Sequence, residues 1–226
     1  MEIQLPLPPR LRHRPLLGFL LSLTALGLFG FIALQIGEGS GLSHLDYAVA
    51  ERLAAHREES PFVRSTFWVI TQWGDVLWFA GLGVVVGVLL LVWRRGWLAL
   101  AWGIALCGGG LLDGGLKDFF RRPRPAPPLR DAWIHTTTSS FPSGHSVGSE
   151  VAYVFLAYLL LLLIPQHWAR WIAASGLGLL ILAIGFSRMY LGAHWCSDVV
   201  GGYLIGAAWV SAAITIVETI RRRRQP

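Results

Sequence analysis

Long apolar runs limit what this chain can fold into more than any other feature of its sequence. Several runs of about 20 residues carry almost no charge, and this is the length that an α-helix needs to cross the hydrocarbon core of a membrane. Of the 226 residues, 54% are hydrophobic and 14% are charged, whereas soluble domains carry about 25% charged residues. These observations predict an all-α membrane protein and argue against a soluble helical one.

The apolar runs and the polar segments between them predict six transmembrane helices. The expected spans cover residues of about 16–36, 67–93, 97–116, 143–164, 171–186 and 194–217. Between the first two spans, Leu42, Leu45, Val49 and Leu53 recur at intervals of three and four residues. Such a pattern is typical of a helix that lies on the membrane surface, so we expect a short interfacial helix there.

The chain is expected to have three parts: an N-terminal tail over 1–14, a six-helix transmembrane domain over 15–218 and a basic tail over 219–226. The first apolar run is longer than the core of a signal peptide, and no clear cleavage site follows it. We therefore interpret it as a retained first span.

The distribution of basic residues predicts the orientation in the membrane. Six spans place both ends of the chain on one side, which then carries ten basic residues against nine on the other. The positive-inside rule assigns that side to the cytoplasm. Several of the nine belong to a suspected substrate site, which would explain them without reference to topology. We expect a bacterial inner-membrane protein with the site facing the periplasm.

Three polar clusters fall on the same outer face in this topology. They are residues 117–125 after the third span, 141–145 before the fourth, and 188–198 between the fifth and sixth. Ionisable groups at a membrane boundary are costly and usually functional. Because chance would spread such clusters over both faces, we expect one shared site.

The residues of these clusters suit a phosphate group. Lys117, Arg124 and Arg188 supply three cations that can neutralise a phosphate and the charge that develops during its transfer. Ser143 and Gly144 open a helix, where backbone N–H groups and the positive helix end favour an oxyanion. The serine hydroxyl could donate a further hydrogen bond, and the glycine would let the backbone come close to the ligand.

Two histidines can divide the work of phosphoryl transfer. His194 and Asp198 are four residues apart, so on a helix the carboxylate can hold one ring nitrogen while the other acts. His194 is then the better nucleophile, and His145 is the natural acid for the leaving oxygen. No cluster of carboxylates suits magnesium, which indicates a route without a metal. We expect no cofactor.

The three clusters together resemble the signature of the type 2 phosphatidic acid phosphatase family, also called the lipid phosphate phosphatases. The matching residues are Lys117 and Arg124-Pro125, then Pro142-Ser143-Gly144-His145, then Ser187-Arg188, His194 and Asp198. The resemblance is strongest over residues 95–217, and the first two spans fit the six-helix membrane branch of the family.

The resemblance implies a role for each matching residue. Lys117, Arg124, Arg188, Ser143 and Gly144 would hold the phosphate. His194 would form a phosphohistidine, Asp198 would orient it, and His145 would protonate the leaving group. The implied activity is hydrolysis of a terminal phosphate from a lipid phosphate or diphosphate. An isoprenoid diphosphate such as undecaprenyl diphosphate, phosphatidylglycerol phosphate and phosphatidate are all open as substrates.

Three other functions stay open at this point. A phosphotransferase could pass the phosphate to an acceptor other than water. A vanadate-haloperoxidase-like oxidase would use a similar motif set, although those enzymes are soluble. A transporter or non-catalytic lipid binder could use the cations alone. The basic residues lie in span flanks and one loop, so we expect lipid phosphate and membrane lipids as partners and no nucleic acid. The oligomeric state is open.

Several neighbouring residues have a plain structural interpretation. Asp113 is expected to pair with Lys117, and Asp75 to start a helix. Arg121 and Arg122 could extend the anion site or be solvated loop charges. The remaining ones are expected to be loop spectators or to make a structural contact: Asp131, His135 and Glu150. The two cysteines, Cys107 and Cys196, show neither a disulfide framework nor a zinc pattern.

Overall fold

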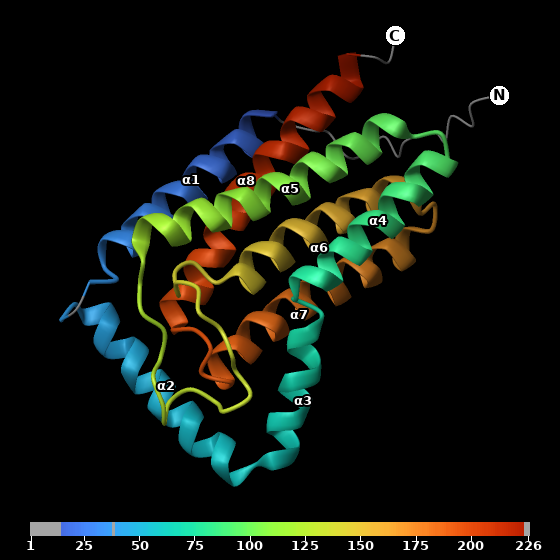
Figure 1. The fold of residues 1–226 in the computed structure, drawn as a ribbon. Coiled ribbons are helices and arrows are strands. Elements are labelled where there is room, and N and C mark those ends of the chain that lie inside the picture. The colour runs from blue at the N-terminus through green and yellow to red at the C-terminus, as the bar shows by residue number, and fades with distance from the viewer. Residues whose placement is uncertain (1–14, 38, 224–226) are drawn as a thin grey trace.

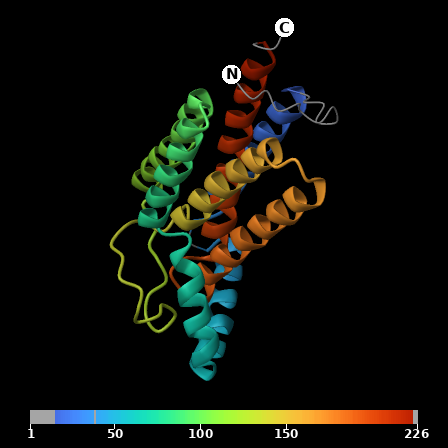
Figure 2. The ribbon, with the colours of Figure 1, turned by 90° about the vertical axis from the view of Figure 1, so that its right-hand side faces the viewer.

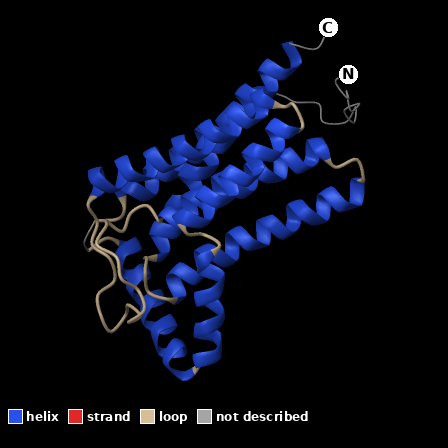
Figure 3. Cartoon of the chain, turned by 45° about the vertical axis from the view of Figure 1, so that its right-hand side comes forward, coloured by secondary structure: helices blue, strands red, loops and turns tan. Residues whose placement is uncertain are grey.

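A computed structural model describes residues 15–37 and 39–223, which form eight helices and no strand (Figure 1, Figure 3). The helices are α1 (Pro15–Leu34), α2 (Gly41–Glu59), α3 (Pro61–Gln72), α4 (Val76–Val92), α5 (Gly96–Phe120), α6 (Gly144–Leu163), α7 (His167–Tyr190) and α8 (Cys196–Arg223). By length and composition, α1, α5, α6, α7 and α8 could each cross a membrane, and α3 with α4 could supply a sixth span. The all-α, six-span prediction is confirmed.

The second span differs from its prediction because it is broken. The sequence favours one continuous helix over 67–93, but α3 and α4 meet at a bend of 44°. Gly74 lies at the bend, and a Cβ there would be 2.6 Å from Ile184 and 2.9 Å from His145. Asp75 then accepts a hydrogen bond of 2.9 Å from the backbone N–H of Leu77, so it starts α4 as expected. The break brings the chain close to the polar end of the bundle.

Helix α2 lies across one end of the bundle (Figure 1). Ser40 caps its first turn by accepting a hydrogen bond from the Ser43 backbone. The face that packs on the protein carries Asp46, Ala50, Ala54 and Arg57, whereas Leu45 stays exposed. The helix therefore forms where the sequence predicts it, and it turns two charged residues inward.

The bundle is built on a few close helix pairs. Helix α1 packs along α8, α6 packs against both α7 and α8, and α4 packs against α5 (Figure 2). The core between them includes Trp102, Val151 and Phe155. Where α8 crosses α6, a Cβ on Gly202 would lie 2.7 Å from Ser146 and 2.8 Å from the Ser143 carbonyl. A small residue here lets the two helix starts approach each other.

The start of α1 and the end of α8 lie at the same end of the bundle, opposite α2, α3 and the loop over 121–143 (Figure 1). Helix α8 runs to Arg223, beyond the predicted end of the span, and Glu218 pairs there with Arg221 and Arg222. Part of the predicted basic tail is therefore helical. The predicted tail over 1–14 and residues 224–226 lie outside the described residues.

Candidate active site

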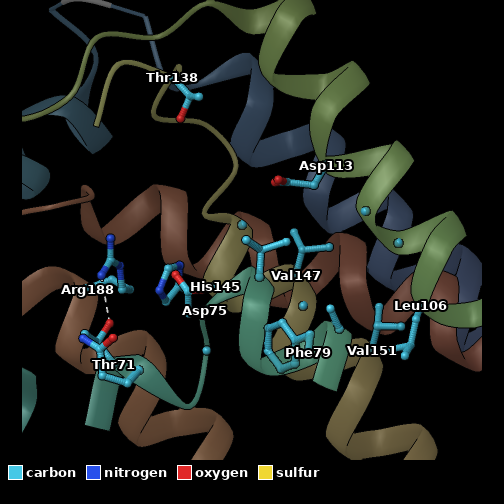
Figure 4. Close-up of a pocket in the computed structure, with 18 of the residues that line it drawn as sticks. Thr71, Asp75, Phe79, Leu106, Asp113, Thr138, His145, Val147, Val151 and Arg188 are labelled. Carbon is cyan, nitrogen blue, oxygen red and sulfur yellow. Dashed lines mark hydrogen bonds between the residues drawn. The ribbon is translucent and has the colours of Figure 1, made fainter. Parts of the chain in front are cut away.

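The three polar clusters meet at one end of a cavity of about 840 Å³ (Figure 4). Lys117 lies near the end of α5, His145 in the first turn of α6 and Arg188 in the last turn of α7. Arg124 comes from the loop after α5, and His194 from the turn between α7 and α8. All five side chains line the cavity. The structure thus brings together five residues that are up to 77 positions apart in the sequence (117 to 194).

The turn after α7 fixes Arg188 and His194 relative to each other. Gly192 has a positive φ of 62°. The Ala193 backbone N–H donates 2.9 Å to the Arg188 carbonyl, and the Gly192 N–H donates 2.9 Å to the Met189 carbonyl. These two bonds are the pattern of a Schellman helix end, which requires the left-handed conformation that glycine adopts without strain. The His194 N–H also donates to the Arg188 carbonyl, at 3.2 Å.

Asp198 lies directly behind His194. Its Oδ2 is 3.4 Å from His194 Nδ1, although Nδ1 has no well-formed hydrogen bond within the described residues. The same oxygen accepts the Trp195 backbone N–H at 2.9 Å and the hydroxyl of Ser140. Because Asp198 is the third residue of α8, it closes the first turn of the helix as a capping-box acid does. The carboxylate is fully buried and faces the imidazole.

Arg124 defines the tautomer of His194. Its Nη1 lies 2.8 Å from His194 Nε2, and a guanidinium can only donate. Nε2 is therefore the unprotonated nitrogen, whose lone pair accepts this hydrogen bond, and Nδ1 carries the proton toward Asp198. The carbonyls of Thr138 and Ala193 hold the Arg124 side chain at 2.8 and 2.9 Å. The nitrogen that faces the cations is therefore the one without a proton.

The surroundings of His194 keep its ring neutral. Burial lowers the pKa of the imidazole well below its ordinary range, and the charges of Arg124, Arg188 and Lys117 lower it further. A neutral imidazole has the lone pair that an attack on phosphorus requires.

The other two cations, Arg188 and Lys117, are also held by hydrogen bonds. Arg188 donates 2.8 Å to the Thr71 hydroxyl of α3 (Figure 4), and its Nε has no partner within the described residues. Lys117 donates to Asp113, as the sequence predicts, and 2.9 Å to the Pro142 carbonyl. A Cβ on Gly144 would lie 2.8 Å from Asp113 and 3.1 Å from the Lys117 ammonium. Only a glycine leaves this pair in place.

Ser143 and His145 occupy different positions at the start of α6. His145 lines the cavity beside Asp75 and Arg188 (Figure 4). Ser143 is fully buried and is not among the cavity-lining residues. Its backbone N–H donates 3.0 Å to the Asp198 carbonyl, which ties α6 to α8. In the described part of the chain its hydroxyl has no hydrogen-bond partner, an arrangement that is costly in a buried group.

The far part of the cavity is apolar. It runs from the polar residues along α4, α5 and α6, where Phe79, Leu106, Val147 and Val151 line it (Figure 4). Gly83, Gly103 and Gly110 widen it because they carry no side chain. Among the described residues, no group of three or more His, Cys, Asp and Glu side chains is arranged to hold a metal ion.

Comparison with known proteins decides the family. The model of the PAP2 superfamily matches residues 96–222, which is more than half of the chain. This chain belongs to the PAP2 superfamily. The match covers every residue of the predicted site, and it confirms the resemblance seen in the sequence.

Relatives of this PAP2 chain are phosphatases. A phosphatidylglycerophosphatase B of Bacillus subtilis is 29% identical over 205 residues, which cover 89% of this chain and 97% of the relative. An undecaprenyl-diphosphatase of Sulfolobus acidocaldarius is 34% identical over 84 residues, 37% of this chain and 35% of the relative. The chain is accordingly a membrane phosphatase. The oxidase and the non-catalytic binder find no support among these relatives.

A solved structure shows the same fold. The crystal structure of a transmembrane PAP2-type phosphatidylglycerolphosphate phosphatase from Bacillus subtilis aligns with a TM-score of 0.82 and 26% identity. The alignment covers 90% of this chain and 98% of the solved one. The shared fold therefore extends beyond the matched PAP2 region into the part of the chain that contains α1 to α4.

The structure corrects the interpretation of Arg122 in this PAP2 chain. The sequence offered it as an extension of the anion site or as a solvated charge, but its side chain is only 9% exposed. It donates 2.6 Å to Asp198 and 2.8 Å to Asp46 of α2. Spacing could not identify either partner, because each lies 76 positions from Arg122 in the sequence. Asp46 is also one of several polar residues on an amphipathic helix. Arg121, in contrast, is exposed.

Two other residues depart from their expected roles. Asp131 is buried and forms ion pairs with Arg57 and Arg64, at 3.3 and 2.7 Å, so it clamps the loop to α2 and α3 rather than being a spectator. Glu150 lies beside Gly206 of α8. The structural hydrogen bond expected for it is not found among the described residues. His135 lines the cavity and is exposed.

Proposed function

We propose that this protein hydrolyses the terminal phosphate of a lipid phosphate or diphosphate through a phosphohistidine, without a metal ion. One observation carries the proposal above all: the acceptor nitrogen Nε2 of His194 faces a cavity that is cationic at this end and apolar beyond it. A phosphate with a long apolar tail fits both parts.

In the first step, the lone pair of His194 Nε2 attacks phosphorus. The P–O bond to the lipid breaks, and its electron pair goes to the leaving oxygen, which takes a proton from His145. Asp198 stabilises the positive charge that develops on the His194 ring, because its Oδ2 faces Nδ1 at 3.4 Å.

In the second step, water attacks the phosphohistidine. The water gives a proton to His145, the P–N bond breaks, and its electron pair returns to Nε2. Arg124, Arg188 and Lys117 balance the charge on the equatorial phosphate oxygens in both steps. Arg124 donates to Nε2 in the free enzyme, so its Nη1 must move to a phosphate oxygen when substrate binds.

The substrate class follows from the cavity. A cationic end and an apolar end within a cavity of about 840 Å³ fit a lipid with its phosphate at the membrane boundary better than a soluble sugar phosphate. Phosphatidylglycerol phosphate is the first candidate, because the relative that covers almost the whole chain is named for that activity. Undecaprenyl diphosphate is the second, from the shorter match. Phosphatidate remains the third.

A lipid phosphotransferase is the alternative function. The same phosphohistidine could react with an alcohol instead of water, because the chemistry at Nε2 is identical.

We place the site at the periplasmic face of a bacterial inner membrane, since the positive-inside rule assigns the end with Arg94, Arg95 and Arg170 to the cytoplasm. An acceptor would then have to reach the outer end of the bundle.

A panel assay tests the proposal. The full chain in detergent is given phosphatidylglycerol phosphate, undecaprenyl diphosphate and phosphatidate, with a metal chelator present, and inorganic phosphate is measured. We expect release from at least one lipid, inhibition by vanadate, and loss of release in His194→Ala. His167→Ala, an exposed histidine at the start of α7, is the matched control and should keep its activity.

Either of two results would overturn the proposal: no release from any lipid by the unaltered protein, or full activity in His194→Ala. Adding an alcohol such as glycerol separates the alternative, because a transferase would form the new phosphate ester at the expense of inorganic phosphate.

A further inference from the structure

A buried chain of charges connects the surface helix α2 to the catalytic carboxylate. Asp46 of α2 is 1% exposed, and its Oδ2 accepts 2.8 Å from Arg122 Nη2. Arg122 Nη1 then donates 2.6 Å to Asp198 Oδ1. The second oxygen of Asp198 is the one that faces His194. Three charged groups thus lie in series behind the nucleophile.

Asp46 and Arg122 also hold the start of α8. Asp46 Oδ1 accepts the Ser197 backbone N–H at 2.9 Å, and its Oδ2 accepts the Ser197 hydroxyl at 2.5 Å. The first N–H groups of a helix lack partners within the helix, so Asp46 does for α8, from another helix, what an N-cap residue usually does. Arg122 donates to the same hydroxyl at 2.7 Å. The contacts leave little freedom to the turn that carries Asp198.

The energetics of burial give Arg122 a function beyond packing. A carboxylate that is fully removed from water takes up a proton unless a cation stays close. Arg122 makes the direct ion pair with Asp198, at 2.6 Å. A protonated Asp198 could not stabilise the imidazolium character that develops on His194 during attack.

Other charged and titratable groups face Asp198 from the elements around it. Lys117 of α5 and Arg124 of the loop contribute positive charge, and Asp46 of α2 contributes negative charge. The Cys196 thiol lies on α8 itself, and His194 lies in the turn before α8. Lys117 and Arg124 must also bind the phosphate. Arg122, in contrast, donates its side-chain hydrogen bonds to Asp198, Asp46 and Ser197.

We propose that Arg122, held by Asp46 of α2, is a positioning residue that keeps the Asp198 carboxylate ionised and turned toward His194. The inference rests on the proposed function, because it assigns the series of three charged groups to the same phosphoryl transfer. It also gives α2 a part in the reaction, because one of its side chains anchors the arginine.

The test compares pH profiles of kcat/KM for phosphate release from phosphatidylglycerol phosphate, the first candidate of the panel, by the full chain in detergent. In Arg122→Gln we expect kcat/KM at neutral pH to fall about 10- to 100-fold, the equivalent of one hydrogen bond to a charged group. The acid limb should move up by about one pH unit, because Asp198 loses the cation that opposes its protonation. Arg122→Lys keeps the cation and should keep the acid limb in place.

A charge-balanced variant separates electrostatics from packing. Arg122→Gln leaves two buried carboxylates without the cation between them, whereas Asp46→Asn combined with Arg122→Gln leaves one. The double variant should therefore be more active than Arg122→Gln. If Arg122→Gln fails to fold, the double variant is compared with Asp46→Asn alone. The acid limb of the double variant should then lie at a higher pH than that of Asp46→Asn.

Glu218→Gln is the matched control for a lost buried ion pair. Glu218 pairs with Arg221 at the opposite end of α8, so this change should lower thermal stability without moving the pH profile. Superimposable acid limbs in the arginine variants and the unaltered protein, or a shift of equal size in Glu218→Gln, would overturn the inference. Absence of phosphate release by the unaltered protein from the whole lipid panel would instead overturn the proposed function.

Discussion

The two ring nitrogens of His194 face groups of opposite character. Nδ1 faces the carboxylate of Asp198, and Nε2 accepts from the guanidinium of Arg124. A single tautomer satisfies both neighbours, with the proton on Nδ1. At the scale of the residue, this arrangement would prepare His194 for the proposed attack before any substrate is present.

Asp198→Asn tests the arrangement behind the ring. The amide of asparagine can donate toward Nδ1, which would favour the tautomer with its proton on Nε2. That proton would point at Arg124 and remove the lone pair from the attacking nitrogen. We expect kcat to fall by about 100-fold or more, with the chain still folded by circular dichroism. A kcat within about twofold of the unaltered protein would contradict the role of Asp198.

The charge of His194 gives a second prediction. Its lowered pKa means that the ring stays neutral as pH falls through the ordinary histidine value of about 6.5, and it becomes charged only at lower pH. ¹⁵N NMR of histidine-labelled protein in detergent, assigned by comparison with His194→Gln, should show a neutral ring protonated on Nδ1 at about pH 6. An imidazolium spectrum at that pH would be inconsistent with the structure.

At the scale of the element, the turn between α7 and α8 carries the strictest backbone requirement. Gly192 has a positive φ, and a Cβ on it would lie 2.1 Å from the Leu129 carbonyl oxygen. The same turn sets the distance between Arg188 and His194. The loop that carries Arg124 and the turn that carries His194 are therefore in close contact at this residue.

Gly192→Ala should disturb both stability and catalysis. The left-handed conformation alone costs an alanine about 1–2 kcal/mol, and the close contact with Leu129 adds to this. Because misplacement by about 1 Å can cost about 100-fold in rate, we expect kcat/KM to fall by that order, together with a lower midpoint of thermal unfolding in detergent. Gly176→Ala in α7, where a Cβ meets nothing within 4 Å, is the matched control. Equal behaviour of the two variants would refute this role of the turn.

The elements could be predicted from the sequence wherever one physical signal dominates. Uninterrupted apolar runs predict the spans. The residues of the candidate phosphate site could be found because they form short motifs that resemble a family signature. The break was not predicted, although Gly74 and Asp75 interrupt the apolar run there. The packing of Gly74 against Ile184 and His145 is visible only in the structure. Asp46 was hidden because a charged residue on an amphipathic helix has the same pattern whether it faces water or the protein.

At the scale of the whole molecule, the cavity joins a polar end to an apolar part between α4, α5 and α6. The loop over 121–143 is fastened over the polar end by Asp131, which pairs with Arg57 and Arg64. A lipid can therefore present its phosphate to His194 while its tail stays among apolar side chains. The architecture explains why the site needs the complete bundle around it.

Gly103→Leu tests the route of the lipid tail. Gly103 lines the cavity, and a Cβ there meets nothing within 4 Å, so we expect a leucine side chain to occupy part of the apolar space. We expect kcat/KM for long-chain lipid phosphates to fall about tenfold or more, while turnover of p-nitrophenyl phosphate, which has no tail, is retained. Gly87→Leu in α4, also unobstructed but outside the cavity, should affect neither substrate. Equal loss on both substrates in Gly103→Leu would argue against a tail at this position.

The most direct measurement is the identification of the phosphorylated residue during turnover. The full chain is mixed with a ³²P-labelled lipid phosphate, quenched in alkali within milliseconds, digested, and its peptides are sequenced by mass spectrometry. We predict acid-labile phosphate on the peptide that contains His194, formed and lost at rates that match turnover, and absent in His194→Ala. Label on His145 instead, or steady turnover with no covalent phosphate on the protein, would contradict His194 as the nucleophile.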